Sequence, residues 1–416
     1  MTFNPIKIVN VKYCRGDDII KMGRLAISNR KILFEYDDEF LKTKLELSPF
    51  KLPLRSGAIA CEDKDNSFEG LFGIFNDSLP DGWGRLLLDR KLTKAGINPI
   101  TITPLDRLCY TGSNGMGALM YEPEISDSEV HQHLKDLDII ADECVHFLDN
   151  DDDKYIDDLL VMNGSSAGAR PKILVSISSD EKLEVTKHNP KTSHDNWIIK
   201  FRSSSDPKDI GCIEYAYNLM AKEAGLDVPE ARLFKSKKCD GYFGVKRFDR
   251  QKSSFVHMHT ISGLLHTDHR VPSLDYETLL KATRYLTKDI QECEKQFRQM
   301  AFNIFSHNRD DHSKNFSFLM DKEGKWKVSP AYDLTFSSGP VGQHCTTILG
   351  EGKNPSVSHM LKLAEIVSIK PKTALTIIDE VKAAASKWDK FADKSKVRAK
   401  SSKNIAATLN QILNTN

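Results

Sequence analysis

The sequence lacks long apolar runs, paired cysteines and an excess of charge of either sign. No apolar stretch approaches the roughly 20 residues that a membrane-spanning helix needs, and the first residues contain no apolar signal-peptide core. The eight cysteines are scattered without a CxxC pair, which argues against a zinc ribbon and a disulfide scaffold. The formal net charge of +1 gives no general attraction to nucleic acid or membrane. We therefore expect a cytoplasmic protein with reduced thiols.

What is present is an ordinary globular composition, 40% hydrophobic and 28% charged, in 416 residues, which suits two or three domains. Residues 1–122 combine strand patterns with short helices. Residues 123–246 contain a linker and a β-rich stretch with one helix, and residues 247–416 are mostly helical apart from one hairpin. This order predicts an α+β, two-lobed, protein-kinase-like fold with a β-rich N-lobe, a helical C-lobe and an extra N-terminal subdomain.

In the first unit, alternating apolar residues predict strands within 6–13, 22–38 and 45–54. Polar residues and a proline at 78–81 precede an apolar-periodic stretch that begins at Trp83. This pattern predicts a helix that starts with a capping residue and has a proline near its first turn.

The most informative segment places Asp310 five residues before Asn315, followed by a hairpin pattern and then Asp333. Protein kinases use this order: an Asp accepts the substrate hydroxyl proton, an Asn at plus five holds Mg²⁺, and a hairpin delivers a second Mg²⁺-binding Asp. Asp311 is the rival base, but only Asp310 has the five-residue spacing. A charged loop without chemistry is the alternative for the D-x-x-x-x-N pattern alone.

Other polar residues surround this loop. His307, His312 and Lys314 lie beside the proposed base, and Lys314 has the reach to offset charge on a transferring phosphate. We expect His312 and Lys314 to contribute to binding of ATP.

The candidate phosphate loop is NGSSAGARPK, residues 163–172, followed directly by a strand pattern. Its small residues allow backbone N–H groups to approach phosphate oxygens, and its two serines are plausible phosphoacceptors. The loop is neither a Walker A nor a G-x-G-x-x-G sequence, so a simple turn is the alternative. Its central residues are Gly164, Ser165, Ser166, Ala167, Gly168 and Ala169.

Lys200 ends the apolar strand pattern NWIIK and resembles the strand lysine that contacts ATP phosphates in kinases. The helix that follows, 209–225, offers Glu214 or Glu223 as its partner, and spacing alone leaves both open. The strand pattern 243–250 falls where two lobes would join, so its backbone is a candidate adenine contact.

Four histidines cluster in HMHTISGLLHTDHR, residues 257–270. Their spacing matches no zinc arrangement, and no HExxH motif occurs. We expect ordinary polar positions here, with a substrate-facing loop as the alternative.

Together these segments resemble the HipA family, bacterial toxin Ser/Thr kinases of type II toxin–antitoxin systems. The resemblance runs in order through nearly the whole chain. The segments are FNDSLPDGWGRLLLDR (75–90), GSNGMGALMYEP (112–123), SSAGARPK (165–172), WIIK (197–200), VKRFDR (245–250), NRDDHSKNFSF (308–318) and SPAYDL (329–334).

The resemblance implies a kinase with an N-terminal subdomain in which Asp310 is catalytic and Asn315 and Asp333 bind Mg²⁺. It places Ser165 at the family's autophosphorylated serine, with Ser166 as the neighbouring possibility. Lys246 and Phe248 match the strand that meets adenine. The implied ATP-binding residues are Ser165, Ser166, Ala167, Gly168, Ala169, Lys200, Lys246, Phe248, His312 and Lys314.

As partners, the resemblance implies a HipB-like helix-turn-helix antitoxin, DNA contacted indirectly through it, and a protein substrate such as an aminoacyl-tRNA synthetase. Phosphorylation of that substrate would cause growth arrest or persistence. The loop reads ARPK at 169–172 where some members have AQEK, which leaves its substrate and regulation open. Two alternatives remain: a small-molecule phosphotransferase of the aminoglycoside or choline kinase type, and a non-catalytic corepressor partner of a DNA-binding antitoxin.

Overall fold

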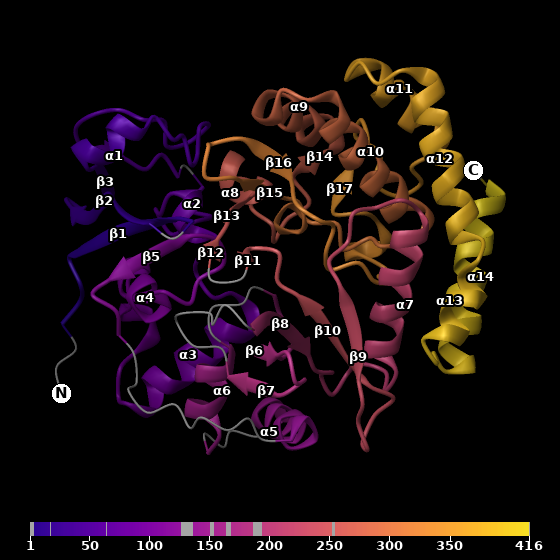
Figure 1. Cartoon of the computed structure of the whole chain (residues 1–416), viewed down its shortest axis with the longest axis horizontal. Coiled ribbons are helices and arrows are strands. Elements are labelled where there is room, and N and C mark those ends of the chain that lie inside the picture. Colours follow the sequence, from indigo (N-terminus) through magenta and orange to yellow (C-terminus); the bar gives the residue numbers. More distant parts are fainter. Residues whose placement is uncertain are drawn as a thin grey trace.

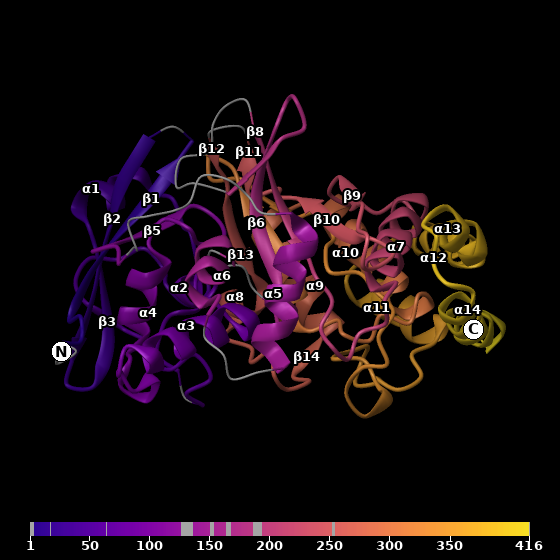
Figure 2. The same ribbon diagram turned by 90° about the horizontal axis from the view of Figure 1, so that it is seen from below.

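The computed structural model describes residues 4–16, 18–63, 65–125, 136–149, 154–163, 168–185, 194–251 and 254–415. Three regions follow one another along the long axis of the molecule (Figure 1). An N-terminal sheet lies at one end, two lobes occupy the middle, and a layer of C-terminal helices closes the other end. The same order is seen from below in Figure 2. The predicted two-lobed arrangement with an extra N-terminal unit is confirmed.

The N-terminal unit is built on an antiparallel sheet of five strands in the order β4-β3-β2-β1-β5. Along β1 the buried residues Val9, Val11 and Tyr13 alternate with more exposed ones, so one face of the strand packs on the core. The elements are β1 (Ile8–Arg15), β2 (Asp18–Ser28), β3 (Lys31–Tyr36), α1 (Asp38–Thr43), β4 (Ile59–Ala60), α2 (Gly73–Asn76), α3 (Gly82–Lys94), α4 (Pro104–Thr111) and β5 (Leu119–Glu122).

One strand prediction in this unit is wrong. Residues 45–54 form bends and turns rather than a strand. Leu47 and Leu52 are buried as an alternating pattern suggests, but Pro49 and Pro53 lack the N–H donors that a sheet ladder needs. The segment therefore packs its apolar side chains without pairing its backbone.

The N-lobe is an antiparallel sheet in the order β7-β6-β8-β10-β9, and its predicted strands are confirmed. Helices α5 and α6 pack on it together with Trp83 and Leu87 of α3, so the N-terminal unit shares a hydrophobic core with this lobe. The elements are α5 (Leu137–Asp149), α6 (Ile156–Asn163), β6 (Lys172–Ser178), β7 (Leu183–Val185), β8 (His194–Lys200), α7 (Ile210–Glu223), β9 (Ala231–Phe234) and β10 (Tyr242–Lys246).

The C-lobe is helical, but it contains more strand than the sequence predicts. The hairpin β15–β16 gains a third strand, β13, whose sequence HMHT shows no apolar alternation. The elements are β11 (Arg250–Gln251), β12 (Ser254–Phe255), β13 (His257–Thr260), α8 (Ile261–Leu265), β14 (Leu274–Asp275), α9 (Tyr276–Thr287), α10 (Ile290–Phe305), β15 (Ser317–Met320), β16 (Trp326–Val328), β17 (Thr346–Thr347), α11 (Val357–Ile366), α12 (Pro371–Ala385), α13 (Trp388–Lys394) and α14 (Ala399–Thr415).

The N-terminal unit and the C-lobe are joined tightly, because one hydrophobic core runs from the N-terminal sheet into the C-lobe helices. Helix α2 crosses α8 at two glycines, and a Cβ atom on Gly73 would overlap the backbone of Gly263. Within the described part of the chain, the helices are all too short or too polar to span a membrane.

Candidate active site

A cavity of about 270 Å³ lies where the N-terminal unit, the N-lobe and the C-lobe meet. Its lining residues come from all three of these units, and most of the predicted site residues that the structure describes are among them. They are Asp77, Asp81, Gly82, Met116, Gly168, Ala169, Lys172, Ile198, Lys200, Phe243, Val245, Lys246, Arg247, Phe248, Asp249, Met258, Thr260, His269, His312, Lys314, Asn315, Tyr332 and Asp333.

The loop after α10 presents Asp310 next to this cavity. Asn315 donates its side-chain N–H to the backbone carbonyl of Asp310 at 2.8 Å, so the five-residue spacing closes a compact turn. Asp310 is exposed. Protein atoms nevertheless crowd its carboxyl group, and this partial burial, together with the carboxylates of Asp333 and Asp311, raises its pKa. A carboxyl group of this kind is suited to receiving a proton.

The neighbouring acid, Asp311, has a different environment. It is fully buried and accepts hydrogen bonds from the hydroxyl of Tyr276 at 2.7 Å, the Nδ1 of His344 at 2.9 Å and the backbone N–H of Thr346 at 3.2 Å. All of these partners belong to the C-lobe. Asp311 therefore holds the loop in place, while Asp310 faces solvent.

Asp333 follows the β15–β16 hairpin in the sequence and lines the cavity. Its φ of 56° lies in the left-handed region, which Asp tolerates better than most residues. The preceding Tyr332 fixes the approach, since its hydroxyl lies in hydrogen-bond contact with Ser317 and with the backbone carbonyl of Lys314. Tyr332 thus connects Asp333 to the loop that carries Asp310 and Lys314.

Lys200 lies between two carboxylates. Its Nζ contacts Asp333 and lies 2.9 Å from Glu214 on α7. Glu223, the other candidate partner on that helix, pairs instead with Lys387 at 3.0 Å. The structure thus resolves the choice that spacing left open, in favour of Glu214.

Glu214 has a second cationic partner. Its other oxygen lies 2.6 Å from Arg170, whose guanidinium also lies 3.3 Å from Asp206. Arg170 belongs to the ARPK sequence that departs from AQEK. In this protein the end of the phosphate loop is therefore tied to the same carboxylate that holds Lys200.

These ion pairs set the charges around the cavity. The Asp333 side chain is 41% exposed, but protein atoms crowd its carboxylate; the charge of Lys200 outweighs this crowding and lowers the pKa, so the carboxylate is ionised at neutral pH. Burial disfavours the charge on Lys200, but Asp333 and Glu214 more than compensate and raise its pKa. Burial lowers the pKa of Lys172 to about 8, and the nearby charge of Lys200 adds to this. Lys172 is therefore a buried lysine that titrates near neutral pH.

The phosphate loop is described only in part. The predicted residues Gly164, Ser165, Ser166 and Ala167 lie outside the described residues, whereas Gly168 and Ala169 line the cavity. Gly168 has a φ of 106°, and a Cβ atom there would overlap Nζ of Lys172. The positive φ favours glycine at this position, and a larger residue would also have to displace the end of the Lys172 side chain.

The segment where the lobes join also reaches the cavity, although β10 ends at Lys246 and the predicted strand does not continue through Phe248. Phe248 lies with its ring centroid 5.6 Å from that of Tyr332, and Lys246, which pairs with Asp195 at 2.8 Å, lines the wall. Asp249 anchors this segment from its buried position by ion pairs with Arg247 and Arg250, at 2.7 and 2.8 Å.

The histidine cluster is mostly structural, as expected. His257 bonds to the carbonyl of Leu47 at 3.0 Å, and burial together with the neighbouring His259 lowers its pKa to about 3. His259 bonds to Asp77 at 2.6 Å, and His266 accepts the N–H of Gly73 at 2.9 Å. All three therefore join the N-terminal unit to the C-lobe. In the part of the chain that the structure describes, no group of three or more His, Cys, Asp or Glu residues is arranged to hold a metal ion.

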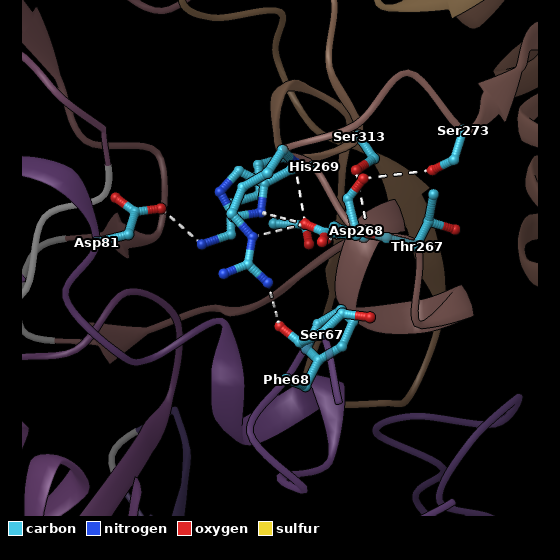
Figure 3. Close-up of polar contacts among 12 residues, drawn as sticks. Ser67, Phe68, Asp81, Thr267, Asp268, His269, Ser273 and Ser313 are labelled. Carbon is cyan, nitrogen blue, oxygen red and sulfur yellow. Dashed lines mark hydrogen bonds and ion pairs between the residues drawn. The ribbon is translucent and has the colours of Figure 1, made fainter. Parts of the chain in front are cut away.

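The fourth histidine of the cluster differs. His269 lines the cavity, and its ring centroid lies 5.8 Å from that of His312 in the catalytic loop. Burial and the charge of Lys314 lower its pKa to about 4. Figure 3 shows His269 and Asp268 between Asp81 on one side and Thr267 and Ser313 on the other. This part of the segment fits the alternative of a loop that faces the substrate.

Sequence reasoning missed three charged residues of this site. Lys172 and Arg170 lie at the end of the predicted phosphate loop. Their positive charge beside this loop was a signal that could have identified them as site residues. Asp81 is one of the polar residues before α3 from which a helix cap is expected, but its side chain makes no capping hydrogen bond to α3. It instead contacts the N–H of Gly168 and lies 2.6 Å from Nζ of Lys314.

Comparison with known proteins shows which protein family the chain matches. A model of the HipA-like C-terminal domain matches residues 164–388, and a model of the HipA N-terminal domain matches residues 18–122. The solved structure of HipA with HipB and operator DNA from Shewanella oneidensis MR-1 covers 97% of this chain and 95% of its own, with a TM-score of 0.68 and 15% identity. At that identity the likeness shows a shared fold.

Two curated relatives carry kinase names. A protein of Sinorhizobium fredii named "Putative kinase" is 23% identical over 46% of this chain and 50% of its own length. A protein of Haemophilus influenzae with the same kinase description is 25% identical over 41% of this chain and 52% of its own. The chain thus spans about half the length of these relatives.

Proposed function

Because the chain belongs to the HipA family, we propose that it is an ATP- and Mg²⁺-dependent protein serine/threonine kinase that acts as the toxin of a toxin–antitoxin system. One observation carries the proposal. An exposed Asp310 with a raised pKa lies beside a cavity where Lys172, Lys200 and Lys314 converge. Phosphoryl transfer needs an oriented hydroxyl and cations around the phosphates, and this arrangement supplies both.

The donor set of the cavity fits Mg²⁺. Asn315 donates its amide N–H to the backbone of Asp310, so its amide oxygen is the atom left for a cation, and Asp333 contributes an ionised carboxylate. Mg²⁺ prefers such oxygen ligands and shares them with phosphate oxygens. When bound, the ion neutralises charge on the phosphates. Asn315 and Asp333 would therefore be its protein ligands.

The remaining walls fit ATP. One side of the cavity is lined by Lys172, Lys200, Gly168 and Ala169. Phosphates bound there would contact cationic side chains and the backbone of small residues. Ile198, Val245 and Phe248 offer apolar surface for the adenine. Asp310 would orient the hydroxyl of the acceptor and take its proton. Because Asp311 is committed to three contacts within the C-lobe, Asp310 is favoured for this role.

We also propose autophosphorylation at Ser165, with Ser166 as the alternative. Both precede Gly168 and Arg170, which lie at the cavity and at Glu214. Substitution of Ser165 with alanine should remove most of the phosphate that the protein incorporates. Mass spectrometry that places the phosphate only outside residues 163–169 would contradict this proposal.

For partners we propose a HipB-like helix-turn-helix antitoxin, through which the kinase contacts DNA indirectly. The Shewanella structure of the same fold contains HipB and operator DNA. The protein substrate would be a component of translation such as an aminoacyl-tRNA synthetase, and its phosphorylation would arrest growth.

One experiment in cells tests the whole proposal. Wild type and Asp310→Ala are expressed at equal levels, and growth and the phosphoproteome are compared. We expect growth arrest and one dominant new phosphoprotein with the wild type only. Identical phosphoproteomes would contradict the protein kinase, and a labelled metabolite in place of a labelled protein would identify a small-molecule phosphotransferase.

A further inference from the structure

Asp81 brings the N-terminal unit into the active site. Its carboxylate accepts the N–H of Gly168 with one oxygen and lies 2.6 Å from Nζ of Lys314 with the other. Gly168 belongs to the phosphate loop, and Lys314 directly precedes Asn315 in the catalytic loop. In Figure 3, Asp81 approaches the cluster around His269 from the opposite side to Thr267 and Ser313. One side chain thus connects both loops that would handle phosphate.

The local backbone of the N-terminal unit is built to allow this reach. Gly82 has a φ of 44°, and a Cβ atom there would lie 2.6 Å from Cα of Ala169. The next residue, Trp83, donates its N–H to the carbonyl of Gly168 at 3.1 Å. The turn at the start of α3 therefore packs directly on the phosphate loop. Asp81 leaves the helix end without a side-chain cap, and its carboxylate faces the other lobes instead.

The pair is charged and well shielded from solvent. The side chains of Asp81 and Lys314 are 20% and 10% exposed. Burial opposes ionisation of Asp81, but the charge of Lys314 and the hydrogen bond from Gly168 outweigh it and lower the pKa of the carboxyl group. An ammonium group on a flexible four-carbon chain needs such an anchor to keep one orientation.

We propose that Asp81 is a positioning residue for phosphoryl transfer, which acts through Lys314 and the phosphate loop. Resting on the proposed kinase function, this role makes the N-terminal unit part of the active site. Asp81 holds the Lys314 ammonium and the Gly168 N–H close together before nucleotide arrives. Donors that are oriented in advance need no reorganisation when charge develops on the transferring phosphoryl group.

A double-mutant cycle tests this role with the full-length protein, labelled ATP and Mg²⁺. Asp81→Asn should lower kcat by about 10- to 100-fold, the scale for small misplacements of catalytic groups. Lys314→Met should lower it at least as much. Because asparagine keeps one oxygen that can accept the N–H of Gly168, Asp81→Asn tests the contact with Lys314, and the double variant should be no slower than Lys314→Met alone. Thermal melting of each variant verifies the fold.

The matched control is Asp89→Asn on the same helix. Asp89 pairs with Arg107 inside the N-terminal unit at 2.7 Å, so this variant also loses an ion pair but should keep the wild-type kcat. Additive losses in the double variant, an unchanged kcat in Asp81→Asn or an increased one would each overturn the positioning role. An inactive wild type would refute the kinase itself, whereas an active wild type with an unchanged kcat in Asp81→Asn would refute only the inference.

Discussion

The two walls of the cavity are held in place in different ways. The C-lobe wall comes mainly from one continuous stretch, 307–333, and His269 and two residues of β13 complete it. Asp311 anchors that stretch through buried contacts with Tyr276, His344 and Thr346. The opposite wall is assembled from separate segments that contribute Asp81, Lys172, Lys200 and Glu214. Its contacts are ion pairs, and some of them reach across to the C-lobe.

This difference matters for the proposed chemistry. The buried hydrogen bonds of the C-lobe wall face away from the cavity, so a bound nucleotide leaves them intact. The ion pairs of Lys200 and Lys314 lie at the cavity itself, where phosphates and Mg²⁺ compete for the same groups. We therefore expect nucleotide to leave the contacts of Asp311 unchanged and to rearrange the ion pair of Lys200 with Asp333.

The largest effect is expected at Asp333, where the two walls meet. Asp333→Asn removes the ionised cation ligand and should lower phosphate transfer by about 100- to 1,000-fold, as for the loss of one group that stabilises a transition state. Transfer rates measured over a Mg²⁺ titration check this. A rate that excess Mg²⁺ restores fully would show that Asp333 only binds the ion, and an unchanged rate would remove it from the site.

The next effect concerns stability. Asp311→Asn should lower the free energy of unfolding by about 2–3 kcal/mol, because donors now bonded to the carboxylate lose their acceptor in a buried place. Denaturant unfolding measures this value. Since Asp310 keeps its own environment, the folded fraction should remain active. A stable Asp311→Asn protein without activity would reverse the roles of the two acids.

A smaller effect is expected at Glu214. Glu214→Gln removes the charge that holds Lys200 and Arg170, and the KM for ATP should rise about 10-fold, equivalent to about 1.4 kcal/mol. Steady-state kinetics measure this change. Glu223→Gln on the same helix is the control, since Glu223 pairs with Lys387 away from the cavity. An equal rise in KM in both variants would mean that the net charge of α7, and not the contact of Glu214 with Lys200, determines the KM for ATP.

The smallest effect is a change in bound protons. With a pKa of about 8, Lys172 is partly neutral at pH 8, and bound phosphates favour its charged form. ATP binding should therefore take up about half a proton at pH 8 and almost none at pH 6.5. Calorimetry in buffers of different ionisation enthalpy measures this number, and Lys172→Met should abolish it. Proton release on binding would contradict the assignment.

The C-lobe wall was predictable because its information is local. The residues from Asp310 to Asn315 form a turn that a hydrogen bond between its two ends closes. The hairpin pattern that follows indicated where the chain brings Asp333 back to the cavity. The spacing to Asn315 separated Asp310 from Asp311, and the structure gives the two residues correspondingly different environments.

The opposite wall was only partly predictable. Lys200 followed from a strand pattern, but its partner on α7 required the packing of that helix to choose Glu214. Asp81 has the sequence context of a helix cap, and its partner Lys314 lies 233 residues away. No local rule predicts a contact of that range. The prediction of a strand at 45–54 was wrong for a related reason. A pattern of buried side chains does not reveal whether the backbone forms hydrogen bonds with a neighbouring strand.

The most direct test of the account is phosphate transfer by the purified protein. Wild type and Asp310→Asn are incubated with labelled ATP and Mg²⁺, and incorporated phosphate is followed by mass, with thermal melting as the check on folding. The account predicts phosphate incorporation by the wild type and a loss of about 100-fold or more in Asp310→Asn, within the range for a general base. Equal incorporation by the two proteins would contradict it.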